Sequence, residues 1–146
     1  MAVYNKFQDF VEQTLLAKHD FSGAGHVFKI YLSNAVPSAS LDAVKADLAE
    51  ITAGNGYTAG GEDTLNTMAE STGTATVTGT KVVWTAAGGS IGPFQYVVLY
   101  NDTQTVPVDP LVTWWDYGSA LTLLTGETFT VKFSGGDPTG TIFTLV

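Results

Sequence analysis

The fold of this chain is decided by two segments, Phe94-Gln95-Tyr96-Val97-Val98-Leu99-Tyr100 and Leu111-Val112-Thr113-Trp114-Trp115-Asp116-Tyr117. Side chains leave a strand on alternate faces, and a strand with one face in water alternates apolar with polar residues. Here both alternate sets are largely apolar. The pattern predicts two strands that are covered on both faces, and we expect the second cover to be a helix or another subunit.

The alternation also predicts which side chains share a face. In the first segment one set is Phe94, Tyr96, Val98 and Tyr100, and the other is Gln95, Val97 and Leu99. In the second segment Val112 and Trp114 are expected to face one way, and Leu111, Trp115 and Tyr117 the other. Strands that need two covers are more typical of an assembly protein than of an enzyme.

Length and composition restrict the classes of protein that fit. The chain has 146 residues, which is enough for one domain, or for one domain with an appended arm. It has no cysteine, and this excludes disulfides, thiolate catalysis and cysteine-based zinc sites. No apolar run reaches the roughly 18–20 residues of a membrane span. The N-terminus does not resemble a secretory signal. We therefore expect no membrane partner.

The charge balance argues against a nucleic-acid partner. The net charge is −8, and all six cationic residues are lysines that are scattered along the chain. Binding to nucleic acid needs clustered cations on the phosphates, and usually arginine forks for recognition. An acidic surface instead keeps free copies apart by mutual repulsion.

The first part of the chain is expected to be helical. Residues 4–18 place Phe7, Phe10, Val11 and Leu15 at the spacing of one helical face. This helix could pack on its own domain or dock as an arm on a neighbour. We divide the chain into an N-terminal helical arm, residues 1–22, and a single β-sandwich domain, residues 23–146.

Two further elements are expected before residue 64. Residues 26–33 alternate as a strand, with Phe28, Ile30 and Leu32 inside and Val27, Lys29 and Tyr31 outside. Ser40 is a candidate N-cap for a short helix over residues 41–51, whose apolar face would be Leu41, Val44, Leu48 and Ile51. The glycine-rich residues 54–61 are expected to form a tight turn, in which glycine adopts positive φ. A phosphate-binding loop is the alternative, but Glu62 and Asp63 follow directly and would repel a phosphate.

From residue 64 onward the pattern is that of strands and turns. Strands are expected over residues 74–80, 81–85, 127–133 and 141–146, in addition to the two that open this subsection. Val82 and Trp84 are the apolar residues of the second of these strands, and Phe129, Val131 and Phe133 are expected to face inward in the third. Regularly spaced short strands predict a mainly β protein, with an antiparallel β-sandwich that is jelly-roll-like or a partly closed barrel.

The search for catalytic or metal-binding patterns gives weak candidates only. His19 is explained as a surface residue at the end of the first helix, and His26 has no second histidine at ligand spacing. Asp102, Asp109 and Asp116 could supply oxygens to Ca²⁺, but they lack the spacing of a calcium loop. There is no Gly-x-Ser-x-Gly elbow. We therefore expect that the protein is not an enzyme, and that it has no catalytic residue and binds no cofactor or metal.

The aromatic residues of the two central strands have two possible roles. Tyr100, Trp114, Trp115 and Tyr117 could form a sugar-stacking platform, or they could fill the core and a subunit interface. We favour the second role, because large aromatic side chains dominate the energetics of interfaces. The candidate interface residues are Phe7, Phe10, Tyr100, Trp114, Trp115 and Tyr117.

Four stretches together resemble a family of small structural proteins of tailed-bacteriophage virions. These stretches are residues 51–61, residues 88–94 continuing through Tyr96 to Asp102, residues 109–119, and residues 126–131. Members of that family also begin with a short helix that ends near Lys18-His19-Asp20. The resemblance covers nearly the whole chain and implies a component of the phage particle, without implying catalytic residues.

Within that class, a small acidic β domain with doubly covered strands fits a capsid decoration, or cement, protein. Such a protein binds the outer shell and stabilises it by clamping neighbouring capsid subunits. The implied partners are the major capsid protein and further copies of this chain, expected to form a trimer. The implied location is the outer capsid surface, after synthesis in the host cytoplasm. The alternatives are a head–tail connector, tail or fibre-base component, and a carbohydrate-binding module for host attachment.

Overall fold

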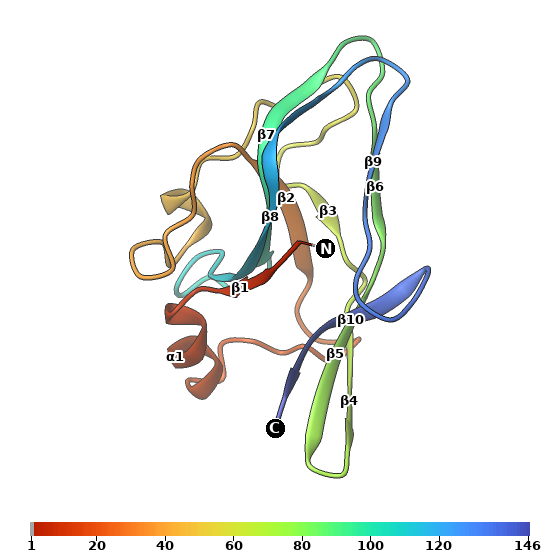
Figure 1. Ribbon diagram of the computed structural model, residues 1–146. Coiled ribbons are helices and arrows are strands. Elements are labelled where there is room, and N and C mark those ends of the chain that lie inside the picture. Colours follow the sequence, from red (N-terminus) through yellow and green to blue (C-terminus); the bar gives the residue numbers. More distant parts are fainter. Residues whose placement is uncertain (1) are drawn as a thin grey trace.

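The computed structural model describes residues 2–146, and in this range the protein is mainly β, with antiparallel sheets and no closed barrel (Figure 1). The expected fold class is confirmed. The helical elements are α1 (Asp9–Leu15) and the 3-10 turn η1 (Lys45–Asp47). The strands are β1 (Tyr4–Lys6), β2 (Phe28–Ser33), β3 (Glu62–Asp63), β4 (Thr67–Ser71), β5 (Thr74–Thr80), β6 (Val82–Thr85), β7 (Ile91–Asn101), β8 (Leu111–Leu123), β9 (Thr128–Val131) and β10 (Thr139–Leu145).

The strands form one large sheet and two small ones. The large sheet has the order β1-β8-β7-β2-β3, and the small sheets have the orders β10-β5-β4 and β6-β9. In Figure 1 the two small sheets lie one above the other, opposite the large sheet. The main core fills the space between these layers, with Val97 and Leu99 from β7, Trp84 from β6 and Ile142 from β10. This arrangement is sandwich-like.

Strands β7 and β8 are apolar on both faces, as their sequences predict. Val97, Leu99 and Val112 belong to the main core, whereas Val98 and Leu111 belong to a second cluster on the opposite face of the large sheet. The buried members of the second cluster are Phe7, Tyr31, Leu48, Tyr96, Val98, Tyr100 and Leu111. The free energy of burial is therefore gained on both sides of these two strands.

Irregular pairing between β7 and β8 changes the expected face of several side chains. The register shifts between Phe94 and Tyr96, so Phe94 joins the main core while Tyr96 joins the second cluster. It shifts again at Val112, so Leu111 and Trp114 share the second cluster. The expected pairing of Val112 with Trp114 on one face is therefore wrong, because an extra residue in one strand inverts the alternation beyond it.

Within the protomer the second cluster is covered by irregular chain, and not by the expected helix over residues 41–51. The predicted helix over residues 41–51 is wrong, since only Lys45–Asp47 forms a 3-10 turn. The backbone of this segment bonds to the large sheet instead: Lys45 donates to Asp109, Leu111 donates to Ala43, and Ile51 donates to Leu32. Leu48 is consequently buried, whereas Leu41 lies exposed.

The glycine-rich residues 54–61 form turns, as expected. Gly54, Gly56, Gly60 and Gly61 all have positive φ, which glycine adopts without steric cost. The Glu50 carboxylate fixes the segment, because it accepts hydrogen bonds from the Tyr57 hydroxyl and the Gly60 N–H at 2.7 Å each. Lys45 pairs with the other oxygen at 2.7 Å. These bonds satisfy a charge that would otherwise be costly to bury.

The predicted helix over residues 4–18 is correct only over Asp9–Leu15. Tyr4–Lys6 pairs with β8 as strand β1. Phe7 and Phe10 do not share one face: Phe7 is buried in the second cluster and Phe10 in the main core. Val11 and Leu15 are exposed. The division at residue 22 stays a prediction, and the structure places both Phe10 and Phe21 in the main core.

The predicted strand over residues 26–33 is confirmed over Phe28–Ser33, with one side chain misassigned. Phe28, Ile30 and Leu32 lie in the main core as expected. Tyr31 was expected outside, but it is buried in the second cluster, and its hydroxyl donates to the Leu48 carbonyl at 3.2 Å. An alternating pattern cannot distinguish a face in water from a face covered by irregular chain.

Candidate functional site

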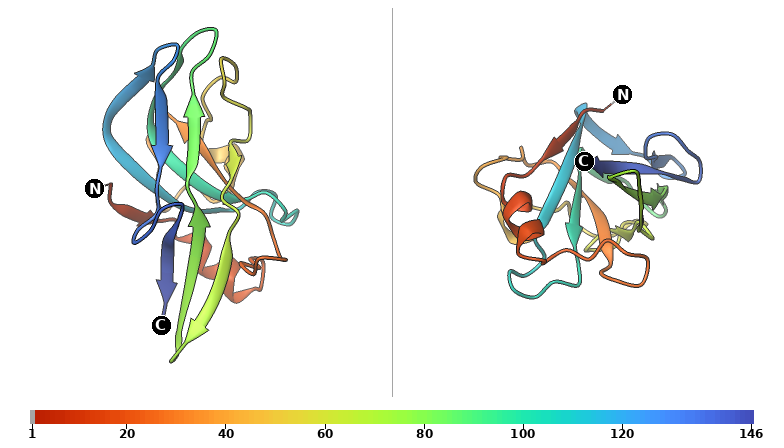
Figure 2. Two further views of the ribbon diagram at one scale, coloured as in Figure 1. Left: turned by 90° about the vertical axis from the view of Figure 1, so that its right-hand side faces the viewer. Right: turned by 90° about the horizontal axis from the view of Figure 1, so that it is seen from below.

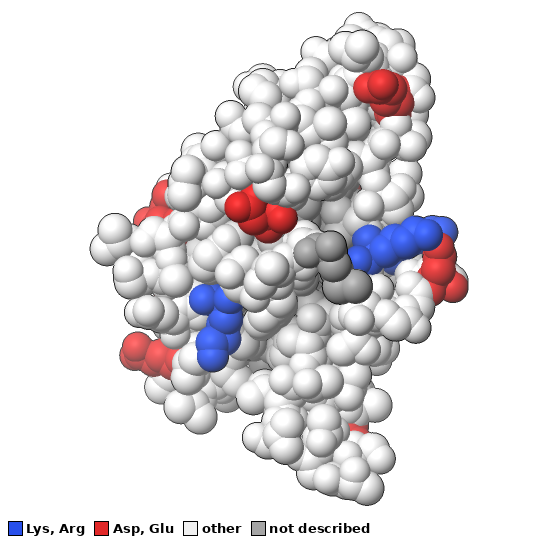
Figure 3. All heavy atoms as spheres, viewed as in Figure 1, with Lys and Arg blue, Asp and Glu red and all other residues white. Residues whose placement is uncertain are grey.

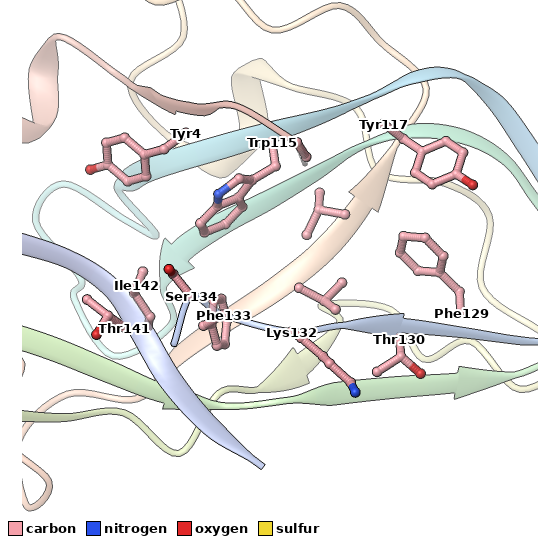
Figure 4. A pocket seen from close by; sticks show the side chains of 13 residues that line it. Tyr4, Trp115, Tyr117, Phe129, Thr130, Lys132, Phe133, Ser134, Thr141 and Ile142 are labelled. Atoms are coloured by element: carbon pink, nitrogen blue, oxygen red, sulfur yellow. The ribbon is translucent and has the colours of Figure 1, made fainter. Parts of the chain in front are cut away.

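An open apolar groove lies between β8 of the large sheet and the strands β9 and β10 of the small sheets. Figure 4 shows the aromatic side chains that project into it from both walls. Its volume is about 350 Å³, within the range of small-ligand pockets. The apolar side chains that shape it include Tyr4, Trp115, Tyr117, Phe129, Phe133 and Ile142.

One wall of the groove depends on the pairing of β1 with β8. The register places Tyr4 opposite Trp115, and the two rings meet edge to face with their centroids 6.1 Å apart. Trp115 then reaches across the groove to Phe133, at 5.9 Å between centroids. Burial raises the pKa of the Tyr4 hydroxyl, and a hydrogen bond with Thr113 partly offsets this. Tyr4 is therefore neutral over the physiological pH range.

Tyr117 stands at the mouth of the groove because β8 bulges there. Tyr96 pairs with Asp116, but Phe94 pairs with Leu121, so β8 has extra residues between these points. Gly118, with φ of 97°, donates its N–H to the Asp116 carboxylate at 2.7 Å. The Tyr117 ring meets Phe129 edge to face at 5.9 Å and remains 54% exposed. A bulge of this kind aims a side chain away from the regular ladder.

The polar side chains of the groove are hydroxyls and one lysine. Thr130, Ser134 and Thr141 line it together with Lys132, and its described lining holds no carboxylate or side-chain amide. Lys132 pairs with Asp137 at 2.5 Å, and the Lys132 and Lys81 ammonium groups lower the pKa of Asp137 to about 2. Figure 3 shows that the surface between β1 and β10 is largely uncharged, with lysine side chains to either side.

The six candidate interface residues do not gather at one place. Phe7, Phe10 and Tyr100 are buried within the protomer's own core. Trp114 lies on the opposite face of β8 from the groove, where it packs on Phe7 with ring centroids 4.5 Å apart. The structure brings only Trp115 and Tyr117 together on the groove, and Tyr117 is the one with an exposed ring.

Two of the three carboxylates considered for Ca²⁺ are engaged in other contacts. Asp102 pairs with Lys29 at 2.7 Å, and Asp116 accepts hydrogen bonds from Gln95 and Gly118. Burial raises the pKa of Asp109, and the nearby Asp102 adds to the effect. The part of the chain that the structure describes contains no group of three or more His, Asp or Glu side chains placed to hold a metal.

The expectation that His19 is a surface residue ending the first helix is wrong. Helix α1 ends at Leu15, and the His19 ring packs between Phe10 and Phe28 with centroids 5.3 and 5.8 Å away. The Asn101 side-chain nitrogen lies within 3.0 Å of Nδ1 of His19 and within 2.9 Å of Nδ1 of His26. These residues join the N-terminal segment to the end of β7.

The sequence did not identify three of the groove residues. Tyr4 was assigned to a helix, and its position on an edge strand depends on a pairing with residues more than a hundred positions away. Phe129 and Phe133 were expected inside the core, and both also line the open groove. The amphipathic pattern of residues 127–133 identifies the inner face of a strand but not the place where the covering layer ends.

Comparison with known proteins identifies no relative of this chain. No protein-family model matches the chain, and no curated protein or solved structure matches it significantly. Among the described residues no helix is long and apolar enough to cross a lipid bilayer.

Proposed function

We propose that this chain is a structural component of a tailed-bacteriophage particle, bound to the outer capsid as a decoration protein. The sequence resemblance of residues 51–61, 88–102, 109–119 and 126–131 supports the phage class. We assign the binding role to the open groove, because it is apolar and lined by aromatic side chains, the residues that dominate the energetics of interfaces. Its natural partner is the major capsid protein.

The chemistry of the groove favours a protein partner over a sugar. Trp115 and Tyr117 could stack on a pyranose ring, but the described lining offers hydroxyls and Lys132 as its only polar side chains. Sites that bind sugars fix their hydroxyls with carboxylates, which accept hydrogen bonds, and with side-chain amides, which both accept and donate. An apolar segment of a protein needs no such groups.

Stabilisation of the shell would follow from mass action. A ligand that binds only the assembled shell stabilises it in proportion to the logarithm of its concentration over its dissociation constant. If many copies of this chain bind the shell, and each copy contacts two shell subunits, the shell should therefore be more resistant to expansion and to heat. The decoration protein would be made in the host cytoplasm and added to the outer capsid surface.

The first experiment measures copy number and position by imaging purified particles and quantifying the chain against the major capsid protein. We expect a copy number comparable to that of the capsid protein, with density on the outer shell. A few copies at one vertex or on the tail would contradict decoration and support a head–tail connector, tail or fibre-base role.

A variant pair tests whether the groove is the binding surface. Tyr117→Asp places a charge at the mouth of the groove, and we expect at least a tenfold loss of binding to shells that lack the chain. Leu124→Asp is the matched control, because Leu124 is also exposed but lies outside the groove. Equal binding by the two variants would exclude the groove as the capsid contact.

A further inference from the structure

The hairpin formed by β4 and β5 projects beyond the rest of the molecule (Figure 2). All five residues of β4, Thr67–Ser71, are exposed. Strand β4 pairs with β5 alone, so its other edge has no strand beside it in the described chain. An exposed strand edge presents unpaired N–H and C=O groups and readily pairs with another chain.

A second hollow lies between α1, β1 and β10, and shares Tyr4 with the groove described above. Its volume is about 330 Å³. The apolar side chains that line it include Tyr4, Val11, Leu15, Phe143 and Leu145. Leu15 is 83% exposed, so this surface has no cover within the protomer. Strand β10 is at the edge of its sheet, where Ser134 bridges to it at Thr141, and its last residues Phe143–Leu145 line this hollow.

The charges of the hairpin and the hollow are complementary. Lys6 is the one charged side chain in the described lining of the hollow, and no described carboxylate lies within ion-pair distance of it. On β4, Met68 and Glu70 are two residues apart and so project from the same face of the strand. An apolar side chain and a carboxylate thus match an apolar hollow with a lysine beside it.

We propose that the hollow binds the β4–β5 hairpin of a second copy of this chain. Strand β4 would lie along β10 of its neighbour, with Met68 among the apolar side chains and Glu70 beside Lys6. The hairpin cannot fill the hollow of its own protomer, because β5 separates β4 from β10 in the same sheet. The contact therefore joins two different surfaces of two copies.

A contact between two different surfaces closes into a ring when the rotation between neighbours allows it. Each protomer would give its hairpin to one neighbour and accept a hairpin from another. The inference rests on the oligomer that belongs to the proposed function, and it specifies the contact that would form the expected trimer. The ion pair would also offset the repulsion between copies that each carry a charge of −8.

Charge reversal tests the contact. Glu70→Lys and Lys6→Glu should each raise the dissociation constant of the oligomer by at least tenfold. The double variant should restore association. Lys18→Glu is the control for a change of net charge, since Lys18 does not line the hollow. Mass photometry and sedimentation velocity measure the assembly, and circular dichroism confirms that each variant is folded.

The absence of cysteine permits a second, independent test. Met68→Cys combined with Leu15→Cys should give disulfide-linked dimers and trimers on oxidation, whereas Met68→Cys combined with Leu124→Cys should not. Equal cross-linking of the two pairs, or association unaffected by both charge reversals, would overturn the inference and leave the oligomer in place. A chain that stays monomeric at high concentration would overturn both the contact and the trimer, while copy number on particles still tests decoration separately.

Discussion

The side-chain nitrogen of Asn101 lies 3.0 Å from Nδ1 of His19, in a half-buried site where the histidine ring packs against phenylalanines. An amide nitrogen only donates, so Nδ1 must accept and the ring must be neutral for this bond to form. Burial lowers the pKa of His19 to about 4, and the positive charge of a protonated His26 adds to the effect. The contact thus couples the N-terminal segment to the protonation state of one ring.

This coupling predicts a loss of stability in mild acid. The pKa of His19 is about 4 in the folded protein and about 6.5 in the unfolded chain, so the unfolded chain takes up the proton first as pH falls. The contribution of His19 is complete above pH 6.5, is lost between pH 6.5 and 4, and amounts to about 3 kcal/mol at most. Urea unfolding at a series of pH values measures it.

The variant His19→Gln separates this histidine from the carboxylates that also titrate in acid. The difference in unfolding free energy between wild type and His19→Gln should shrink as pH falls from 6.5 to 4. His26→Gln is the control and should keep most of the wild-type dependence, because burial is the larger cause of the shift. A pH-independent difference between wild type and His19→Gln would contradict the assignment.

Glu50 is predicted to be a major determinant of stability outside the sheets. It accepts hydrogen bonds from the Tyr57 hydroxyl and the Gly60 N–H and pairs with Lys45. Glu50→Ala leaves these donors unsatisfied and should cost about 3 kcal/mol of unfolding free energy. Chemical denaturation measures the loss, and Glu12→Ala on the exposed face of α1 should change stability by less than about 0.5 kcal/mol.

The two groove residues on β8, Trp115 and Tyr117, should differ in how much they contribute to stability. Trp115 is half-buried against Tyr4 and Phe133, so Trp115→Ala should lower the unfolding free energy by about 3 kcal/mol. Tyr117→Ala removes an exposed ring and should cost about 1 kcal/mol or less. Thermal or chemical unfolding of both variants gives the comparison, and equal losses would mean that Tyr117 is part of the core.

Gly61 is predicted to tolerate no side chain. Its φ is 71°, and an added Cβ would lie 1.9 Å from the carbonyl oxygen of Ile30. Gly61→Ala should therefore cost well over 2 kcal/mol, because both strain and a backbone clash oppose it. Gly73→Ala is the control: it shares a positive φ but meets no atom within 4 Å, and it should cost about 1 kcal/mol. Measured unfolding free energies of the two variants test whether Gly61→Ala is the more destabilising, and equal losses would contradict the predicted clash.

The sequence predicts those parts of the fold that depend on local alternation. Val97, Val98 and Leu99 identify a strand with two buried faces, and Phe129 and Val131 identify the inner face of β9. It cannot predict where an extra residue interrupts the ladder, as at Val112, because bulges depend on the partner strand. The face of every later side chain changes with each bulge.

The candidate site was predictable only in part, for a related reason. Leu48 has helical spacing from Leu41, Val44 and Ile51. The segment nevertheless forms backbone hydrogen bonds to the large sheet and its flanking residues instead of a helix, because tertiary contacts override local helix propensity. Trp115 and Tyr117 were identified because large aromatic residues rarely lack a packing role. Tyr4 was not identified, since no local pattern shows that an N-terminal segment will pair with β8.

The pairing of β1 with β8 also constrains how the chain can fold during synthesis. Asn5 and Thr113, which share a hydrogen bond, are 108 residues apart, so the first strand leaves the ribosome long before its partner. Until then Tyr4 lacks the ring of Trp115, and Phe7 lacks the ring of Trp114. The large sheet can therefore close only when β8 has emerged, and the rings of Tyr4 and Phe7 stay without these two tryptophan partners until then.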